Sequence, residues 1–148
     1  MASVTRQRVG QAIAQLMPRI IQGIQLDFFV QRGVTQTQFL VLMALHGYGE
    51  RSECIMGTLA RNMHVRMPTA TGIVNRLVRA GYVRRHPKPE DRRQVVVALT
   101  PKGYAFIHAF QAVVRHRWEE VLRSLKPAEL ATFHRVVTKL YGQLQPSR

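Results

Sequence analysis

The segment 56–100 constrains the fold of this chain most, because it places two helical patterns before two strand patterns. The second helical pattern has Pro68 in its first turn and Gly81 at its end, the positions that these residues favour in helices. Its apolar residues share one face, and its polar residues share the other. The apolar face consists of Ile73, Val74, Leu77 and Val78. This helix therefore packs on one side and offers hydrogen-bonding groups on the other.

Two strands are predicted after this helix, over 82–86 and 95–99, because both stretches are rich in β-branched and aromatic residues. The residues between them, 87–93, form a turn-rich basic loop. A short helix over 55–61 precedes the longer one, with a turn at 62–64. Two helices followed by a hairpin with cations at its tip predict a winged helix-turn-helix. The expected fold class is mainly α with a small β-hairpin wing (α+β).

Helices with long apolar stripes flank this unit. The first helix carries Val9, Ile13, Leu16, Ile20, Ile24 and Phe28 at helical spacing before Gly33 ends it. Thr35 and Gln38 form a capping-box pattern for a helix over 36–46. Thr100 and Pro101 open a further long helix. Pro127 begins a last helix, whose stripe consists of Leu130, Phe133, Val137, Leu140 and Leu144.

The apolar surface of these flanking helices exceeds what a compact winged unit buries. We therefore predict a DNA-binding domain over 35–100, an N-terminal dimerisation helix within 1–34 and C-terminal dimerisation helices within 101–148. The alternative is a monomer in which the flanking helices fold back as a cap. No apolar run is long enough to span a bilayer and no signal peptide opens the chain, so a cytoplasmic location is expected.

The charge balance points to a polyanionic partner. The chain has 22 Lys and Arg residues against 8 Asp and Glu residues, a formal charge of +14. Phosphates attract such a surface at long range and release counterions on contact. The cations expected to contact the phosphate backbone around the motif are Arg51, Arg61, Arg66, Arg79, Arg84, Arg85 and Lys88.

Base reading requires side chains in the N-terminal half of the second helix, because that half enters the major groove. The candidates by position are Arg66, Thr69, Thr71, Asn75 and Arg76. Arginine matches guanine and asparagine matches adenine. At the wing, Arg92 or Arg93 is expected to enter the adjacent minor groove. Asp91 has the wrong sign to contact DNA, so we expect it to hold an arginine side chain through paired hydrogen bonds.

The motifs in this order resemble those of the MarR (multiple antibiotic resistance regulator) family of transcription factors. The resemblance rests on residues 38–42, 59–60, 69–71, 76–77, 80–83, 89–93 and 99–103. It implies a homodimeric DNA-binding transcription regulator, and it supports the role given to the 91–93 run. Two recognition helices in one dimer predict a pseudo-palindromic operator with half-sites about one helical turn, roughly 10 bp, apart.

The resemblance also implies a repressor that a small phenolic or other aromatic acid releases from DNA. Such an effector would bind where the dimerisation helices meet the winged domain, and no cofactor is implied. The residues expected to line that site are Leu16, Arg19, Ile20, Phe39, Met43, His46, Phe106 and Phe110. The same residues also fit a plain hydrophobic core, and the sequence leaves repression and activation open.

Other chemistries find less support in the sequence. Cys54 is the single cysteine, so it fits a buried small hydrophobe better than a redox switch, which would need a second cysteine to resolve it. The six histidines are too scattered to predict a metal site. No phosphate loop or nucleophile elbow occurs, so no enzyme is predicted. A sequence-tolerant architectural DNA-binding protein remains the alternative.

Overall fold

The computed structural model describes residues 4–144, except the side chains of residues 23 and 25–27. Six helices and three strands follow one another along this part of the chain. In order they are α1 (Arg6–Arg32), α2 (Gln36–His46), β1 (Glu53–Ile55), α3 (Met56–Asn62), α4 (Met67–Arg79), β2 (Val83–Pro87), β3 (Val95–Leu99), α5 (Pro101–Leu122) and α6 (Pro127–Leu144). None of these helices is both long enough and apolar enough to cross a membrane.

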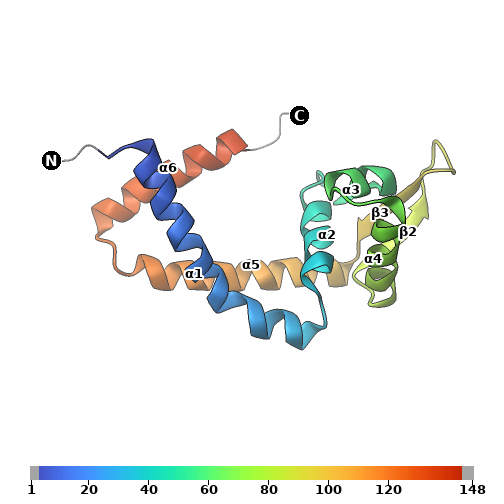
Figure 1. Ribbon diagram of the computed structural model, residues 1–148, viewed down its shortest axis with the longest axis horizontal. Helices are drawn as coiled ribbons and strands as arrows, with labels where there is room; N and C mark the ends of the chain where they lie inside the picture. The colour runs from blue at the N-terminus through green and yellow to red at the C-terminus, as the bar shows by residue number, and fades with distance from the viewer. Residues whose placement is uncertain (1–3, 145–148) are drawn as a thin grey trace.

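The molecule has two ends joined by the long helix α5 (Figure 1). One end holds α2, α3, α4 and the three-stranded sheet, and the other holds α6 together with the N-terminal part of α1. The helix α1 crosses α5 and returns the chain to the first end, where Phe28 and Phe106 bring the two helices together with ring centroids 5.2 Å apart. We call residues 34–100 the winged unit, and we call α6 with residues 6–21 of α1 the terminal helices.

The helix boundaries follow the local signals in the sequence. Gly33 ends α1 in the left-handed conformation with φ 62°. The predicted capping box is present, because Thr35 Oγ1 accepts from the backbone of Gln38 and Gln38 Oε1 accepts from the backbone of Thr35. Thr100 caps α5 by accepting a hydrogen bond from Gly103 N at 3.2 Å. The predicted mainly α fold with a winged hairpin is confirmed.

The sheet has one strand more than the predicted hairpin. Its order is β1-β3-β2, with antiparallel pairing on both sides of β3. The sequence analysis predicted no strand before the short helix over 55–61, whereas Glu53–Ile55 forms a strand and α3 begins at Met56. A strand of three residues shows no measurable alternation, and it exists because β3 provides a pairing partner that is distant in the sequence.

The hydrophobic core lies in the winged unit and at its junction with α1 and α5. The largest fully buried side chains are Leu42, Leu45, Leu59, Leu77, Ile107, Val41, Val74 and Val97. Phe28 and Phe29 of α1 also belong to this core. In contrast, α6 buries none of its residues. The division at residues 34 and 100 stays a prediction, because the core of the winged unit includes side chains from both flanking segments.

Candidate nucleic-acid interface

Helix α4 packs within the winged unit, with one face buried and the other open. Ala70, Val74 and Leu77 are fully buried. Arg66 is the N-cap residue, with φ −73° and ψ 152°, and Pro68 lies in the first turn. The apolar face therefore anchors the helix, while its polar face is left free along the whole length.

The residues predicted to read bases all lie on α4 or at its cap. Thr71, Asn75 and Arg79 follow one another at four-residue steps and so share one side of the helix. Thr69 and Arg76 lie beside them, seven residues apart. Arg66, Thr69, Arg76 and Arg79 are exposed, and Thr71 and Asn75 are half-buried. These six residues therefore form one continuous polar surface.

A groove of about 600 Å³ lies between the N-terminal half of α4, the start of α3 and the wing. Its lining includes Met67 and Thr71 from α4 and Arg85, Arg92 and Arg93 from the wing. The structure thus brings Thr71 together with both arginines that were predicted for the minor groove.

The other face of the sheet carries Arg84 and Lys88. Successive residues of a strand point to opposite faces, so Arg84 lies across the sheet from Arg85. Arg84 and Lys88 line a second groove of about 650 Å³ together with Glu53. They do not meet the residues of α4 that were predicted to read bases. The predicted site is therefore divided between two faces of the wing.

Asp91 makes a different contact in this structure from the predicted pairing with an arginine side chain. Its Oδ1 accepts a hydrogen bond from the backbone N–H of Arg93 at 3.1 Å, and no ion pair within 4.0 Å joins it to an arginine side chain among the described residues. Gln94 N also donates to Asp91 O, at 2.9 Å. An aspartate readily accepts from the N–H two residues ahead in a tight turn, and this local contact competes with pairing to a long side chain. Asp91 therefore shapes the turn.

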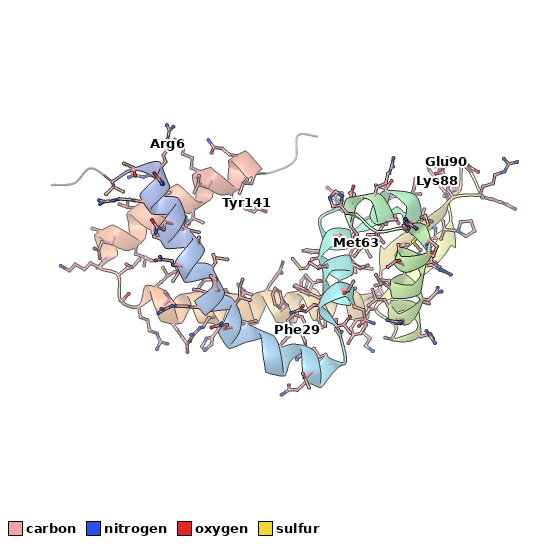
Figure 2. The ribbon with its side chains drawn as sticks, in the orientation of Figure 1. Arg6, Phe29, Met63, Lys88, Glu90 and Tyr141 are labelled. Carbon is pink, nitrogen blue, oxygen red and sulfur yellow. The ribbon has the colours of Figure 1, made fainter. Side chains whose placement is uncertain are left out.

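The tip of the wing extends away from the rest of the molecule. Figure 2 shows Lys88 and Glu90 there, at the opposite end of the molecule from Arg6 and Tyr141. The turn is closed by a backbone hydrogen bond from Lys88 N to Gln94 O at 2.9 Å. Arg92 and Arg93 are exposed beyond this closure. The wing thus holds two exposed cations across the groove from the N-terminal half of α4.

The arginines of α4 and of the wing are free of acidic partners within the described part of the chain. The ion pairs found there at the wing join Arg51 and His86 to Glu53, at 3.9 and 3.6 Å. The remaining ones lie within α5. Free cations on one face are available for phosphates and base edges without breaking a bond first. The electrostatics of this face therefore suit a duplex.

The residues predicted to bind an effector fall into two groups. Phe39, Phe106 and Phe110 pack together, with 4.6 Å between the ring centroids of Phe39 and Phe110, and Met43 packs against the same core. His46 Nε2 lies 3.4 Å from Gln111 Nε2 of α5, and its ring lies near those of Tyr104 and His108. Ile20 is buried, whereas Leu16 and Arg19 lie on an exposed part of α1. Neither of the two grooves is lined by any of these eight residues. The effector site stays a prediction.

Cys54 behaves as a buried apolar residue. Its exposed fraction is 9%, and burial raises the pKa of its thiol from 9.0 to about 11. The reactive thiolate is therefore scarce at neutral pH, as predicted for a structural cysteine. Burial, followed by the nearby Cys54, also raises the pKa of the Tyr48 phenol. Within the described residues, no three histidine, cysteine or acidic side chains are grouped closely enough to hold a metal ion.

Some residues of the groove were missed or assigned a lesser role by the sequence reasoning. Arg85 was expected only as a phosphate contact, yet it lines the groove with Thr71. The alternation of a strand would have separated Arg85 from Arg84. Met67, which is 47% exposed at the start of α4, and Gln94 also line the groove. The polar pattern of the second helix alone does not identify an apolar lining residue such as Met67.

Known proteins share parts of this sequence. A sequence profile described as the MarR family matches residues 34–95. The chain is 31% identical to the multiple antibiotic resistance protein MarR of Salmonella typhimurium over 109 residues, which are 72% of this chain and 73% of that protein. It is 27% identical to the HTH-type transcriptional repressor IacR of Pseudomonas putida over 138 residues, which are 93% of this chain and 76% of that protein.

Solved structures show the same fold. The structure of wild type MarR in its apo form from E. coli superposes with a TM-score of 0.65 at 24% identity, covering 95% of this chain and 98% of that one. The structure of RV1404 from Mycobacterium tuberculosis superposes with a TM-score of 0.77 at 23% identity, covering 99% of each chain. The arrangement of α1, α5 and α6 around the winged unit is therefore shared with these proteins.

Proposed function

This chain belongs to the MarR family of DNA-binding transcription regulators, and from that premise we propose that it is a homodimeric, sequence-specific repressor of a pseudo-palindromic operator. The observation that carries the proposal is the polar face of α4 beside the free arginines of the wing. Helix α4 supplies side chains to the major groove, and Arg92 or Arg93 reaches the adjacent minor groove. Repression is favoured because relatives such as IacR are named repressors.

Exposed apolar side chains on the terminal helices support the homodimer. Leu130, Phe133, Val137, Leu140 and Leu144 are between 38 and 83% exposed on α6. A single chain leaves these residues in water at a cost, and a second copy removes them from it. Members of this family act as dimers, so a pair of terminal-helix surfaces places two α4 helices on one side of a duplex.

We also propose that a small aromatic acid weakens DNA binding. The aromatic side chains Phe39 and Phe110 lie where α1, α2 and α5 meet, and Arg19, nearer the N-terminus of α1, is an exposed cation that suits a carboxylate. A molecule seated there would change the angle between the winged unit and the dimer interface. Titration with small aromatic carboxylates, followed by thermal shift and by operator affinity, tests this part, and Arg19→Ala should weaken the response without lowering DNA affinity.

The central test is selection of bound fragments from random DNA, followed by affinity measurements with competitor DNA. A repressor should prefer one palindrome over bulk DNA by about 10³-fold or more. Equal affinity for all sequences would instead indicate a sequence-tolerant architectural protein. With the selected operator, Arg76→Ala should cost about 1–3 kcal/mol and relax recognition at one position of each half-site.

The wing is tested separately by replacing Arg92 and Arg93 together with alanine. These residues are expected to contact a narrow minor groove and its phosphates, so affinity should fall for every sequence. The salt dependence should become shallower by about two to four counterions per dimer, since each chain loses one or two contacts. The matched control is Arg123→Ala, because Arg123 is exposed at the end of α5, far from the wing. Unchanged affinity in the Arg92 and Arg93 variant would remove the wing from the proposed interface.

A further inference from the structure

Tyr82 lies at the end of the recognition helix α4, where the helices α1 and α5 meet. It is 6% exposed and immediately follows Gly81, whose φ of 81° turns the chain out of α4. Its backbone N–H donates to Leu77 O at 2.9 Å, which ties it to the last turn of α4. Its carbonyl oxygen accepts from Thr100 N at 3.1 Å, which ties it to the residue that caps α5. The backbone of Tyr82 therefore links the end of α4 to the start of α5.

Side chains from the start of α5 satisfy the open carbonyls at the end of α4. Lys102 Nζ donates to Ala80 O at 2.7 Å, and Thr100 Oγ1 donates to Gly81 O. The last carbonyls of a helix lack partners within the helix and carry the negative end of its dipole, so a cation is favoured there. Lys102 Nζ also lies 4.6 Å from the centroid of the Tyr82 ring. These contacts fasten α5 to α4 from the side of α5.

The backbones of the two segments touch without an intervening side chain. A Cβ atom built on Gly103 would overlap the carbonyl oxygen of Tyr82, and it would lie 3.1 Å from Leu99 Cδ2. Gly103 is therefore required here for close approach. Because no side chain lies between the backbone of α5 at Gly103 and that of Tyr82, a rotation of α5 at this point must move the end of α4 with it.

The ring of Tyr82 extends the linkage to α1. Its hydroxyl donates to Arg32 O at the end of α1, at 3.3 Å, and its ring lies 5.4 Å from the ring of Phe106 at an angle of 73°. Arg32 is itself held by a hydrogen bond from its Nη1 to Phe28 O at 3.2 Å, with its guanidinium 4.0 Å from the centroid of the Phe28 ring. One tyrosine thus contacts the ends of α1 and α4 and the beginning of α5.

We propose that Tyr82 and Lys102 are positioning residues that fix the angle between the recognition helix α4 and the pair α1 and α5. Neither residue is required to contact DNA in this role. The proposal rests on the proposed function in one respect, since a fixed angle matters for DNA only if the flanking helices set the separation of two recognition helices. The predicted consequence is a narrow tolerance for the spacing between the half-sites of the operator.

The first experiment measures the angle directly and needs no DNA. Spin labels are attached at Asn62→Cys in α3 and Arg115→Cys in α5, two exposed positions, after Cys54→Ser removes the single native cysteine. Dilution with unlabelled chain restricts the measured distances to pairs within one molecule. The parent should give one narrow distance distribution. Tyr82→Phe, which removes only the hydroxyl, and Lys102→Met, which removes the charge, should each broaden it, and the double variant should broaden it most.

The controls separate positioning from general destabilisation. Tyr104→Phe makes the same chemical change on α5, at a hydroxyl with no hydrogen bond among the described residues, and it should leave the distribution narrow. Lys102→Arg keeps a cation and its donors, so it should restore most of the parent behaviour. If Tyr82→Phe and Lys102→Met lower the melting temperature but keep the parent distribution, both residues are merely structural and the proposal is wrong.

The second experiment uses operators whose half-sites are moved apart by one base pair. For the parent, this insertion should lower affinity strongly. In Tyr82→Phe the penalty for the insertion should shrink by about 2- to 12-fold, the range expected for one hydrogen bond, while the salt dependence stays unchanged. An equal penalty in the parent and both variants would overturn the positioning role. If no palindrome is bound at all, the proposed function fails, and the distance measurement still decides the role of Tyr82.

Discussion

The winged unit and the terminal helices are built from the same kinds of apolar residue, yet they bury them very differently. Leu77 and Val97 of the winged unit are fully buried within the single chain. Phe133 and Leu140 of α6 are 38 and 47% exposed. The winged unit therefore completes its core from one chain, whereas the terminal helices have an apolar surface that only another surface can cover.

The winged unit also differs from α5, the helix that leads to the terminal helices, in the pairing of its arginines. In α5, near the terminal helices, Arg117 Nη1 lies 3.0 Å from Glu120 Oε2, and Arg115 Nε lies 3.9 Å from Glu119 Oε1. In the winged unit, the arginines of α4 and of the wing tip have no acidic partner among the described residues. Arginines are thus paired with carboxylates along the middle of α5, and those of α4 and the wing tip are left free where contact with phosphate is expected.

The largest effect is expected from a substitution that disrupts the apolar surface of the terminal helices and leaves the winged unit unchanged. Leu140→Glu places a charge in the apolar stripe of α6, where a dimer would bury it at high cost. The variant should be monomeric by analytical ultracentrifugation, and its affinity for the palindromic operator should fall by about 10²- to 10⁴-fold because bivalent binding is lost. Its far-ultraviolet circular dichroism should stay close to that of the parent.

The matched control is Ala131→Glu, which adds the same charge to the same helix. Ala131 is exposed and lies on the face of α6 away from Leu140 at helical spacing. This variant should remain dimeric and bind the operator as the parent does. If both variants are dimeric, the apolar stripe of α6 is not the dimer interface and the contrast between the two regions has another cause.

The second effect concerns the core of the winged unit. Leu77→Ala removes a fully buried side chain from α4 and should lower the free energy of unfolding by about 2–5 kcal/mol. Denaturant titration followed by circular dichroism measures it. Val137→Ala on α6 is the control, because Val137 is 45% exposed in the single chain. At protein concentrations low enough to dissociate the dimer, Val137→Ala should have little effect. Equal losses of unfolding free energy in Leu77→Ala and Val137→Ala would show that the winged unit and α6 do not differ in the burial of their apolar residues.

The third effect uses the single cysteine as a probe of the closed core. Burial raises the pKa of the Cys54 thiol from 9.0 to about 11, so thiol-reactive dyes should label it about 100-fold more slowly at pH 8 than a thiol of ordinary pKa. Ala131→Cys with Cys54→Ser provides that ordinary thiol on α6 and should react at the rate of a free cysteine. Rapid labelling of Cys54 in the native protein would show that the core of the winged unit opens readily.

The same shift predicts a pH dependence with a definite sign. The folded state keeps the Cys54 thiol protonated up to about pH 11, whereas the unfolded chain loses this proton near pH 9. Its contribution to stability is therefore complete below about pH 9 and is lost as the pH rises through about 11. The free energy of unfolding of the parent is compared with that of Cys54→Ala across this pH range. The difference isolates the contribution of the thiol, because the alanine variant lacks the titrating group.

Much of the architecture was predictable because its signals are local. The capping box of Thr35 and Gln38, the left-handed Gly33 and the cap of α5 all lie within a few residues of the boundary that they set. The strand β1 was missed because its partner β3 lies about forty residues away, and no local pattern distinguishes three such residues from a loop.

The positions of the candidate site residues along the elements were predictable, whereas their grouping around the wing was not. Helical periodicity predicted that the polar residues of the second helix share the face opposite its apolar residues, and in the structure Thr71, Asn75 and Arg79 lie on one side of α4. The grouping of Arg85 with Thr71, and of Arg84 with Lys88, depends on the side of the sheet to which each residue points. That direction is fixed by the register of β2 on β3. The sequence analysis treated the basic residues as one cluster of charge, and such a cluster does not reveal the register.

The smallest expected effect distinguishes the two roles considered for Asp91. Asp91→Ala removes the oxygen that accepts from Arg93 N, so the wing turn should loosen and operator affinity should fall by about 2- to 12-fold. Asp91→Asn keeps an oxygen in that place, so it should bind as the parent does if the turn is what matters. An ion pair with an arginine side chain requires the negative charge instead, and in that case the asparagine variant would lose as much affinity as the alanine variant. Neither Asp91 variant should shift the unfolding transition of the winged unit, because the tip of the wing lies far from the core of that unit.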